Sequence, residues 1–184
     1  AILSKLPMIA KGEVPLQLES GDHNDNYCIF ADVVRENDTI RVYNVHLQSI
    51  KIKSDEFTYV DDNGVVTIDK SAAIENVVTK LRKAYPMRAE QTKLVLDHAK
   101  DSPFPVVICG DFNDTPLSYT YQQFQKLYTD ASRELSRGIS STYAGRMPAG
   151  RIDYIFYSSG LNGSYFHIQN ETLSDHRAVW CRLN

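Results

Sequence analysis

A carboxylate and a carboxamide come directly after a short apolar run in the segment Val106-Val107-Ile108-Cys109-Gly110-Asp111-Phe112-Asn113. The apolar residues predict a buried strand over 105–109, which places Asp111 and Asn113 at its end. Side chains of these two types suit a metal-bound water or an anionic phosphate oxygen. Because Asp and Asn also begin ordinary turns, the pair alone does not establish a function.

Two clusters of titratable residues lie further along the chain, in Arg151-Ile152-Asp153-Tyr154-Ile155 and Ser174-Asp175-His176-Arg177. Asp153 falls within an apolar, strand-like run, where a buried charge requires a partner such as His176 or Arg151. A carboxylate beside a histidine fixes the tautomer of the ring and stabilises its imidazolium form, which suits a general base. A purely structural ion pair is the alternative interpretation of Asp153.

Other segments contribute further candidate side chains. His46 ends a β-rich segment, where a structural histidine at a sheet edge is the alternative to a catalytic one. Tyr143 shortly precedes the Asp153 segment and is either a substrate-binding residue or an aromatic anchor for a loop. Arg88 and Gln91 share one face of a predicted helix, which either approaches the site or, as the default expectation, is exposed to solvent.

Strands are predicted before and after a central helical region. Residues 27–34 and 39–46 form a hairpin around the polar turn Arg35-Glu36-Asn37-Asp38, and the second strand delivers His46. A smaller hairpin is predicted around Asp61-Asp62-Asn63-Gly64, between Thr58-Tyr59-Val60 and Val65-Val66-Thr67-Ile68. The other predicted strands are Ala1-Ile2-Leu3, 105–109, 151–157, 164–169 and 178–183.

The central region is predicted to hold three helices. The first is amphipathic, and Pro86 then breaks or kinks it; its apolar residues are Ile74, Val77, Val78 and Leu81. The second runs from about Met87 to Lys100. The third has Thr115 as N-cap and Pro116 as first residue, and ends near Tyr128. Helices with strands on both sides indicate mixed α/β layers rather than an alternating parallel sheet.

The composition limits the classes of function. With 184 residues and a net charge of −3, the chain is expected to form a single domain over 1–184, and it has no run of Lys or Arg that would grip long nucleic acids. Its longest apolar stretches are too short to span a membrane. The cysteines have no close pairing and are interpreted as buried free thiols: Cys28, Cys109 and Cys181.

Taken in order, the motifs resemble those of the endonuclease/exonuclease/phosphatase (DNase I-like) superfamily. The matching segments are Ala1-Ile2-Leu3-Ser4-Lys5-Leu6-Pro7, Asn44-Val45-His46-Leu47, Gly110-Asp111-Phe112-Asn113, Arg151-Ile152-Asp153-Tyr154-Ile155 and Ser174-Asp175-His176-Arg177. They run nearly from one end of the chain to the other. The resemblance implies an α/β fold in which two β-sheets pack face to face, helices cover the outside, and loops at one edge form the site.

The same resemblance implies a role for each matching residue. His176 would activate or position the attacking water, and Asp153 would orient and charge that histidine. Asp111 and Asn113 would bind the nucleophilic water and the phosphate, or a second metal. His46 would donate a hydrogen bond to a phosphate oxygen.

Asp175 is the residue that the resemblance assigns as a metal ligand, directly or through water. Mg²⁺ or Mn²⁺ suits a cluster rich in Asp and free of Cys better than zinc does. The implied activity is divalent-metal-dependent hydrolysis of a phosphoester, a phosphodiester first of all, in a nucleic acid, a phospholipid or a sugar or inositol phosphate. A non-catalytic binding module that retains the scaffold is the alternative.

The beginning of the chain departs from the family pattern. Family members carry an early Asn and a metal-binding Glu upstream of the Ile2-Leu3-Ser4 segment, whereas Glu13 and Glu19 lie after it. We therefore expect a domain without its N-terminal strands, the C-terminal portion of a longer enzyme, which alone binds metal weakly and hydrolyses poorly. Substrate identity, localisation and oligomeric state stay open.

Overall fold

The computed structural model describes residues 1–16, 25–50, 58–60, 66–68, 70–138, 140–145, 150–171 and 173–184. A six-stranded sheet with the strand order β1-β2-β3-β6-β8-β7 forms its centre. These strands are β1 (Met8–Glu13), β2 (Tyr27–Arg35), β3 (Asp38–His46), β6 (Val106–Asp111), β7 (Thr129–Asp130) and β8 (Asp153–Tyr157).

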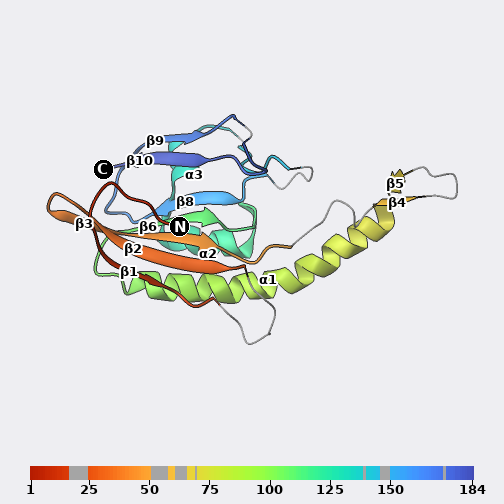
Figure 1. Cartoon of the computed structure of the whole chain (residues 1–184), viewed down its shortest axis with the longest axis horizontal. Helices are drawn as coiled ribbons and strands as arrows, with labels where there is room; N and C mark the ends of the chain where they lie inside the picture. The colour runs from red at the N-terminus through yellow and green to blue at the C-terminus, as the bar shows by residue number, and fades with distance from the viewer. Residues whose placement is uncertain are drawn as a thin grey trace.

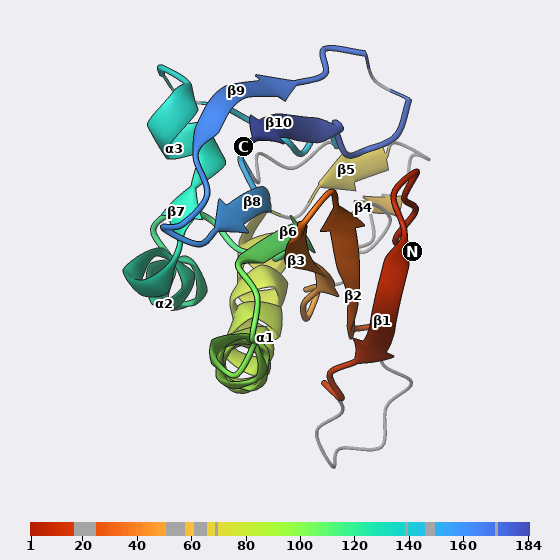
Figure 2. The same ribbon diagram turned by 90° about the vertical axis from the view of Figure 1, so that its left-hand side faces the viewer.

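The two faces of this sheet are covered by different elements (Figures 1 and 2). One face packs against α1 (Lys70–Lys100) and α2 (Tyr119–Leu127). The opposite face packs against α3 (Ala131–Leu135) and a two-stranded antiparallel sheet of β9 (Gly163–Ile168) and β10 (Val179–Leu183). This arrangement confirms the predicted α/β class with two packed β layers and helices on the outside.

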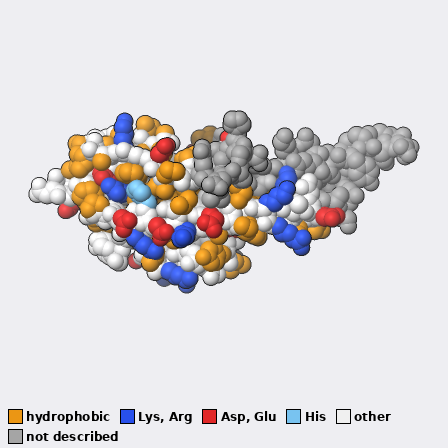
Figure 3. All heavy atoms as spheres, turned by 90° about the horizontal axis from the view of Figure 1, so that it is seen from below, with side chains coloured by type: hydrophobic (Ala, Val, Ile, Leu, Met, Phe, Trp, Pro, Cys, Tyr) orange, Lys and Arg blue, Asp and Glu red, His pale blue; other side chains and the backbone are white. Residues whose placement is uncertain are grey.

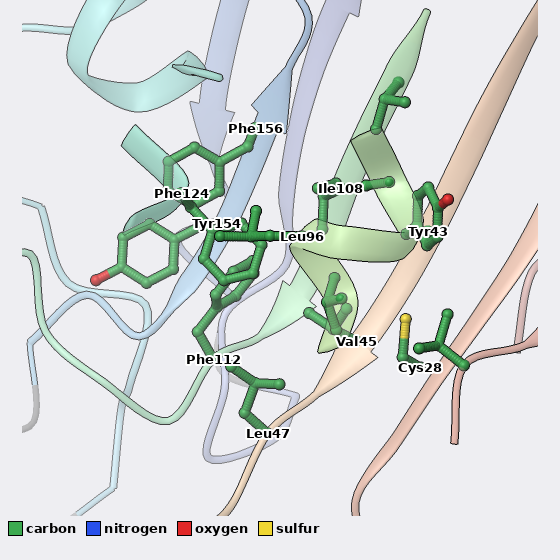
Figure 4. Packing of buried hydrophobic residues seen from close by; sticks show 14 of the residues in the cluster. Cys28, Tyr43, Val45, Leu47, Leu96, Ile108, Phe112, Phe124, Tyr154 and Phe156 are labelled. Carbon is green, nitrogen blue, oxygen red and sulfur yellow. The ribbon is translucent and has the colours of Figure 1, made fainter. Parts of the chain in front are cut away.

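Each interface has its own hydrophobic core. Between the large sheet and the helices, a hydrophobic cluster includes the aromatic residues Phe112, Phe124, Tyr154 and Phe156, all 1% exposed or less (Figure 4). Full burial of one such side chain stabilises the fold by about 1.5–3 kcal/mol. A smaller cluster centred on Phe166 joins β6 and β8 to the β9–β10 layer. The sheet is therefore held rigidly from both sides.

The strand register places three site residues in one row. The predicted hairpin of β2 and β3 is confirmed, and its register places Tyr27 opposite His46. Strand β3 then pairs with β6 in parallel, so that His46 is opposite Asp111. Strand β8 pairs antiparallel with β6, and Asp153 is opposite Asp111. Three strands far apart in sequence thus deliver an imidazole and two carboxylates to the same edge.

The central helix differs from the prediction. Helix α1 is one continuous helix of 31 residues that contains Pro86, and not two helices separated there. Pro86 is exposed, so water can solvate the carbonyl of Arg82, to which a proline cannot donate. Figure 1 shows the first half of α1 extending away from the sheet, and Ile74 is accordingly 65% exposed.

Two local predictions are corrected. Ala1-Ile2-Leu3 is not a strand, and the first strand begins only at Met8. Thr115 does not cap a helix, because residues 115–118 form a turn and the N-cap of α2 is Ser118, whose side chain accepts from Tyr121 N. Polar residues occur at both positions, so the sequence alone did not distinguish the turn from the cap.

The small hairpin is confirmed by the pairing of β4 (Thr58–Val60) with β5 (Val66–Ile68), although its turn, residues 61–64, lies outside the described residues. All three cysteines are free; Cys28 is buried, and Cys109 and Cys181 are half-buried. Among the residues that the structure describes, no helix combines the length and the hydropathy needed to cross a bilayer.

Candidate active site

His176 and Asp153 form the central pair of the site. The ring nitrogen Nδ1 of His176 lies 3.0 Å from Asp153 Oδ2 and 3.1 Å from Oδ1. An ionised carboxylate only accepts hydrogen bonds, so Nδ1 carries the proton and Nε2 holds the lone pair of the neutral ring. Burial lowers the pKa of His176, but the carboxylates of Asp153, Asp111 and Asp175 outweigh it, so the pKa is raised overall. This is the geometry of an oriented base.

Asp111 lies between the two histidines. Its Oδ2 is 3.7 Å from His46 Nε2 and 3.9 Å from His176 Nε2, distances of electrostatic contact rather than hydrogen bonding. Burial and the charge of Asp153 raise the pKa of Asp111 to about 6, although the backbone hydrogen bond from Asn113 opposes the rise. The Asp111 and Asp153 carboxylates repel each other in a half-buried position, so a bound cation would stabilise their ionised forms.

His46 is oriented in the same way as His176. Its Nδ1 lies 2.7 Å from the carbonyl oxygen of Asp25, which can only accept, so Nδ1–H donates and Nε2 faces Asp111. The ring also contacts Tyr27, with 5.5 Å between centroids. Both imidazoles therefore present the same nitrogen to one carboxylate.

The backbone after β6 has an unusual conformation that brings Asn113 back onto Asp111. Gly110 has φ of 137°, and a Cβ there would lie 2.0 Å from Val45 O. Asn113 has φ of 52°, in the left-handed region that Asn tolerates better than most residues. Its backbone N donates to Asp111 Oδ1 at 2.8 Å, and its Nδ2 donates to Oδ2 at 3.0 Å. Gly110 and Asn113 are thus the residues of this segment whose backbone conformations the local fold constrains.

A group of three side chains could hold a metal ion. One ligand atom from each of Asp111, Asp153 and His176 lies within 4.8 Å of the others. Asp175, the predicted metal ligand, is exposed and is not part of this group; Ser174 Oγ donates to its Oδ1, and its backbone oxygen accepts from Ala144 N. Its charge still contributes to the raised pKa of His176, so Asp175 lies at the rim of the site.

Tyr143 borders the site from the loop before β8. It forms an isolated bridge with His176, and the two rings contact edge to face with 5.3 Å between centroids. The predicted substrate-binding residue is therefore in place beside the histidine, where it equally anchors its loop. The other predicted partner of Asp153 is engaged elsewhere, because Arg151 forms a bidentate ion pair with Asp130 at 2.7–2.9 Å.

Thr142 was not predicted as a site residue, and the default expectation for Arg88 and Gln91 was wrong. Thr142 is fully buried, and its Oγ1 accepts from the backbone N–H groups of Ile152 and Asp153 at 3.0 Å. Arg88 and Gln91 are 1% and 0% exposed, so the expectation of a solvated helix face was wrong. No spacing in the sequence distinguishes a buried threonine in a loop, whereas an arginine and a glutamine one turn apart gave a weak signal.

Several solved structures share this fold. They include a mannosyl-6-phosphatase from Bacteroides thetaiotaomicron (17% identity, TM-score 0.67), an endonuclease/exonuclease/phosphatase from Bacteroides vulgatus (17%, 0.70) and D. rerio TDP2 complexed with a single strand DNA product (15%, 0.65). Each match covers 97% of this chain and 67%, 66% and 68% of the respective structure, so the chain spans about two thirds of their length.

Sequence comparison gives the family directly. No curated protein is similar enough in sequence to count as a match. The sequence profile of the Endonuclease/Exonuclease/phosphatase family, in contrast, matches residues 1–176, which include every predicted site residue. On this match, and with the DNase I-like fold in agreement, the chain belongs to the endonuclease/exonuclease/phosphatase family.

Proposed function

We propose that this chain carries the hydrolytic site of a divalent-metal-dependent phosphoesterase. The observation that carries the proposal is the His176–Asp153 pair, whose free ring nitrogen faces Asp111 at 3.9 Å. A base, a carboxylate that orients it and a second carboxylate beside it are what the activation of a water molecule requires. The similar structures whose names include a phosphatase and a protein bound to a DNA product support this class of reaction.

Each site residue has a separate role in the proposed reaction. His176 Nε2 takes the proton of the attacking water, and Asp153 stabilises the imidazolium that forms. Asp111 orients that water and the phosphate, and Asn113 fixes the carboxylate by donating its amide to Asp111 Oδ2, while the same amide donates to Leu47 O. His46, with Nδ1 held by the Asp25 carbonyl, donates from Nε2 to a phosphate oxygen once it is protonated.

The donor set fits a hard divalent cation. Asp111 and Asp153 supply converging carboxylate oxygens, Asp175 adds a third at the rim, and none of the ligand candidates is a cysteine. Mg²⁺ and Mn²⁺ prefer such oxygens. When bound, the cation neutralises charge on the non-bridging oxygens of the substrate. The raised pKa of Asp111 supports this fit, since a cation would favour its ionised form.

A phosphodiester is the first substrate class to test. On the face of the molecule seen in Figure 3, Lys and Arg side chains lie next to Asp and Glu side chains, without one continuous basic patch over the described residues. The net charge of −3 and the lack of a run of Lys or Arg in the sequence do not favour tight binding of a long duplex, so a short or single-stranded nucleic acid, a phospholipid or an inositol or sugar phosphate fits better.

Hydrolysis assays with Mg²⁺ test the proposal. Plasmid DNA, RNA, sphingomyelin and inositol phosphates serve as substrates, and we expect His176→Ala to lower the rate by at least about a hundredfold. His167→Ala is the matched control, because His167 lies on β9 and packs against Tyr165 and Trp180. Undiminished activity in the His176 variant would refute the assigned role, and binding without turnover by wild type would favour the non-catalytic module.

A further inference from the structure

Helix α1 has buried polar side chains that contact the loops following β3 and β6. Arg88 is 1% exposed, Gln91 0% and Thr92 1%, although they belong to a helix whose first half extends away from the sheet. An arginine is almost never buried to this degree unless its charge is compensated. The contacts of Arg88 therefore indicate why it is placed there.

Arg88 binds the loop that follows β6. Its Nη1 donates to the carbonyl oxygen of Asn113 at 2.6 Å and lies 2.9 Å from Asp114 Oδ2, where both side chains are at most 5% exposed. The guanidinium group also lies over the ring of Tyr85, with 5.0 Å to the centroid. The charge is thus paired, and one of its two oxygen partners belongs to a site residue.

Gln91, one helical turn further on, binds the loop that follows β3. Its Oε1 accepts from the backbone N–H of Gln48 at 2.9 Å. The preceding residue, Leu47, accepts from Asn113 Nδ2 at 3.0 Å and donates its N–H to the carbonyl of Asp111. The loops after β3 and β6 are therefore tied to each other and to the same face of α1.

This connection matters because Asn113 is held in a conformation that it would not adopt freely. A non-glycine residue at φ of 52° requires support from its surroundings. The Arg88 contact is made to the carbonyl of this residue, while the Asn113 side chain donates to Asp111 Oδ2. If the carbonyl were released, rotation of the peptide would move the amide away from the carboxylate.

We propose that Arg88 is a positioning residue of the site, which holds Asn113 so that its amide stays on Asp111, and that Gln91 supports it by fixing the adjoining loop. The inference rests on the proposed function, because the amide that it positions fixes the carboxylate that would orient water and phosphate. Arg88 itself touches neither the substrate nor the reacting atoms.

Three variants of the full chain test this inference. Arg88→Met removes the charge and both contacts, whereas Arg88→Lys keeps a charge near Asp114 on a shorter side chain. Arg82→Met is the matched control, since Arg82 lies on the same helix and is exposed. Steady-state kinetics with Mg²⁺ and the NMR signal of the Asn113 side-chain amide are measured for each.

We expect Arg88→Met to lower kcat by about a hundredfold with little change in KM, because a displacement of about 1 Å in a catalytic group has an effect of this size. Arg88→Lys should recover part of the loss, and Arg82→Met should match wild type. The Asn113 amide signal should shift in both Arg88 variants and not in the control.

Wild-type kcat and an unshifted Asn113 amide in either Arg88 variant would overturn the inference. If Arg88→Met does not fold, the Arg88→Lys variant decides on the same two measurements. If wild-type protein hydrolyses none of the substrates, the proposed function fails, but the Asn113 amide signal still decides whether Arg88 positions that residue.

Discussion

Two imidazole rings present Nε2 to Asp111 because the other nitrogen of each ring is already held. Nδ1 of His176 is hydrogen-bonded to the Asp153 carboxylate, and Nδ1 of His46 to the Asp25 carbonyl. Because one partner is charged and the other is neutral, the two rings are expected to have different roles. A carboxylate stabilises an imidazolium strongly, whereas a neutral carbonyl fixes the tautomer and direction of the ring. This difference supports His176 as the base that accepts the proton of water.

Asp153→Asn should lower the pKa of His176 in metal-free protein. Burial lowers this pKa and the Asp153 carboxylate raises it, so the variant retains the lowering influence and loses the strongest raising one. A titration of the His176 ring signals by NMR measures the shift. Asp97→Asn on α1 is the control, because Asp97 pairs with Lys100 at 3.4 Å and is not part of the site. An unchanged titration in Asp153→Asn would contradict the assigned pairing.

The same residues show what the sequence could reveal about the site. Asp111 and Asn113 stand out because they follow an apolar run, and Asp153 because it interrupts one. Arg88 and Thr142 could not be recognised in this way, because their importance depends on backbone groups of other loops that they contact. Asp175 as a metal ligand stays a prediction, since its side chain lies outside the compact group of possible ligands.

At the scale of elements, the site is a consequence of strand register. β6 pairs with β3 on one side and β8 on the other, and Asp111 is opposite His46 and Asp153. A shift of one residue would turn each side chain to the opposite face of the sheet. The aromatic core around Phe112 and Phe156 holds this register, and so links hydrophobic packing directly to the geometry of the charged groups.

Gly110→Ala should disrupt this register. A Cβ at this position would lie 2.0 Å from Val45 O and 2.9 Å from Val45 N, which are backbone atoms of the paired strand and cannot move aside cheaply. We expect the free energy of unfolding to fall by at least about 2 kcal/mol in a denaturant titration. Gly138→Ala is the control, because Gly138 also has a positive φ, of 91°, but its Cβ would meet no atom within 4 Å.

The control should lose only about 1 kcal/mol, the cost of a left-handed conformation without a clash. Equal losses at Gly110 and Gly138 would show that the close approach of β3 and β6 does not limit stability.

Contacts between elements also explain why the predicted break of the central helix at Pro86 was wrong. Downstream contacts of Val95 and Leu96 with the core favour a continuous α1 despite Pro86, and local sequence patterns do not contain such contacts.

At the scale of the whole molecule, the two β layers have unequal sizes. The central sheet has six strands, whereas the layer formed by β9 and β10 has two among the described residues. Strands at 164–169 and 178–183 were predicted and are confirmed as β9 and β10, whose residues Phe166 and Cys181 belong to the smaller hydrophobic cluster. The very short β7 and α3 were not predicted, since two and five residues are too few for a periodic pattern.

Binding of Mg²⁺ should stabilise the whole molecule through the site. A ligand that binds only the folded state stabilises it by about 2.7 kcal/mol at one hundred times its Kd, which corresponds to a rise in Tm of roughly 5–10 °C for a chain of this size. Asp111→Asn should abolish most of this rise, because it removes a carboxylate that lies within 4 Å of both histidines and belongs to the group of possible metal ligands. Thermal unfolding is followed by circular dichroism, with and without EDTA.

Asp97→Asn again serves as the control and should retain the full response to Mg²⁺, because Asp97 is exposed on α1 and lies outside the group of possible ligands. A Tm that rises equally in wild type and in Asp111→Asn would place the cation elsewhere. A Tm that is insensitive to Mg²⁺ and Mn²⁺ up to millimolar concentrations would mean that the carboxylates in this chain do not suffice for binding.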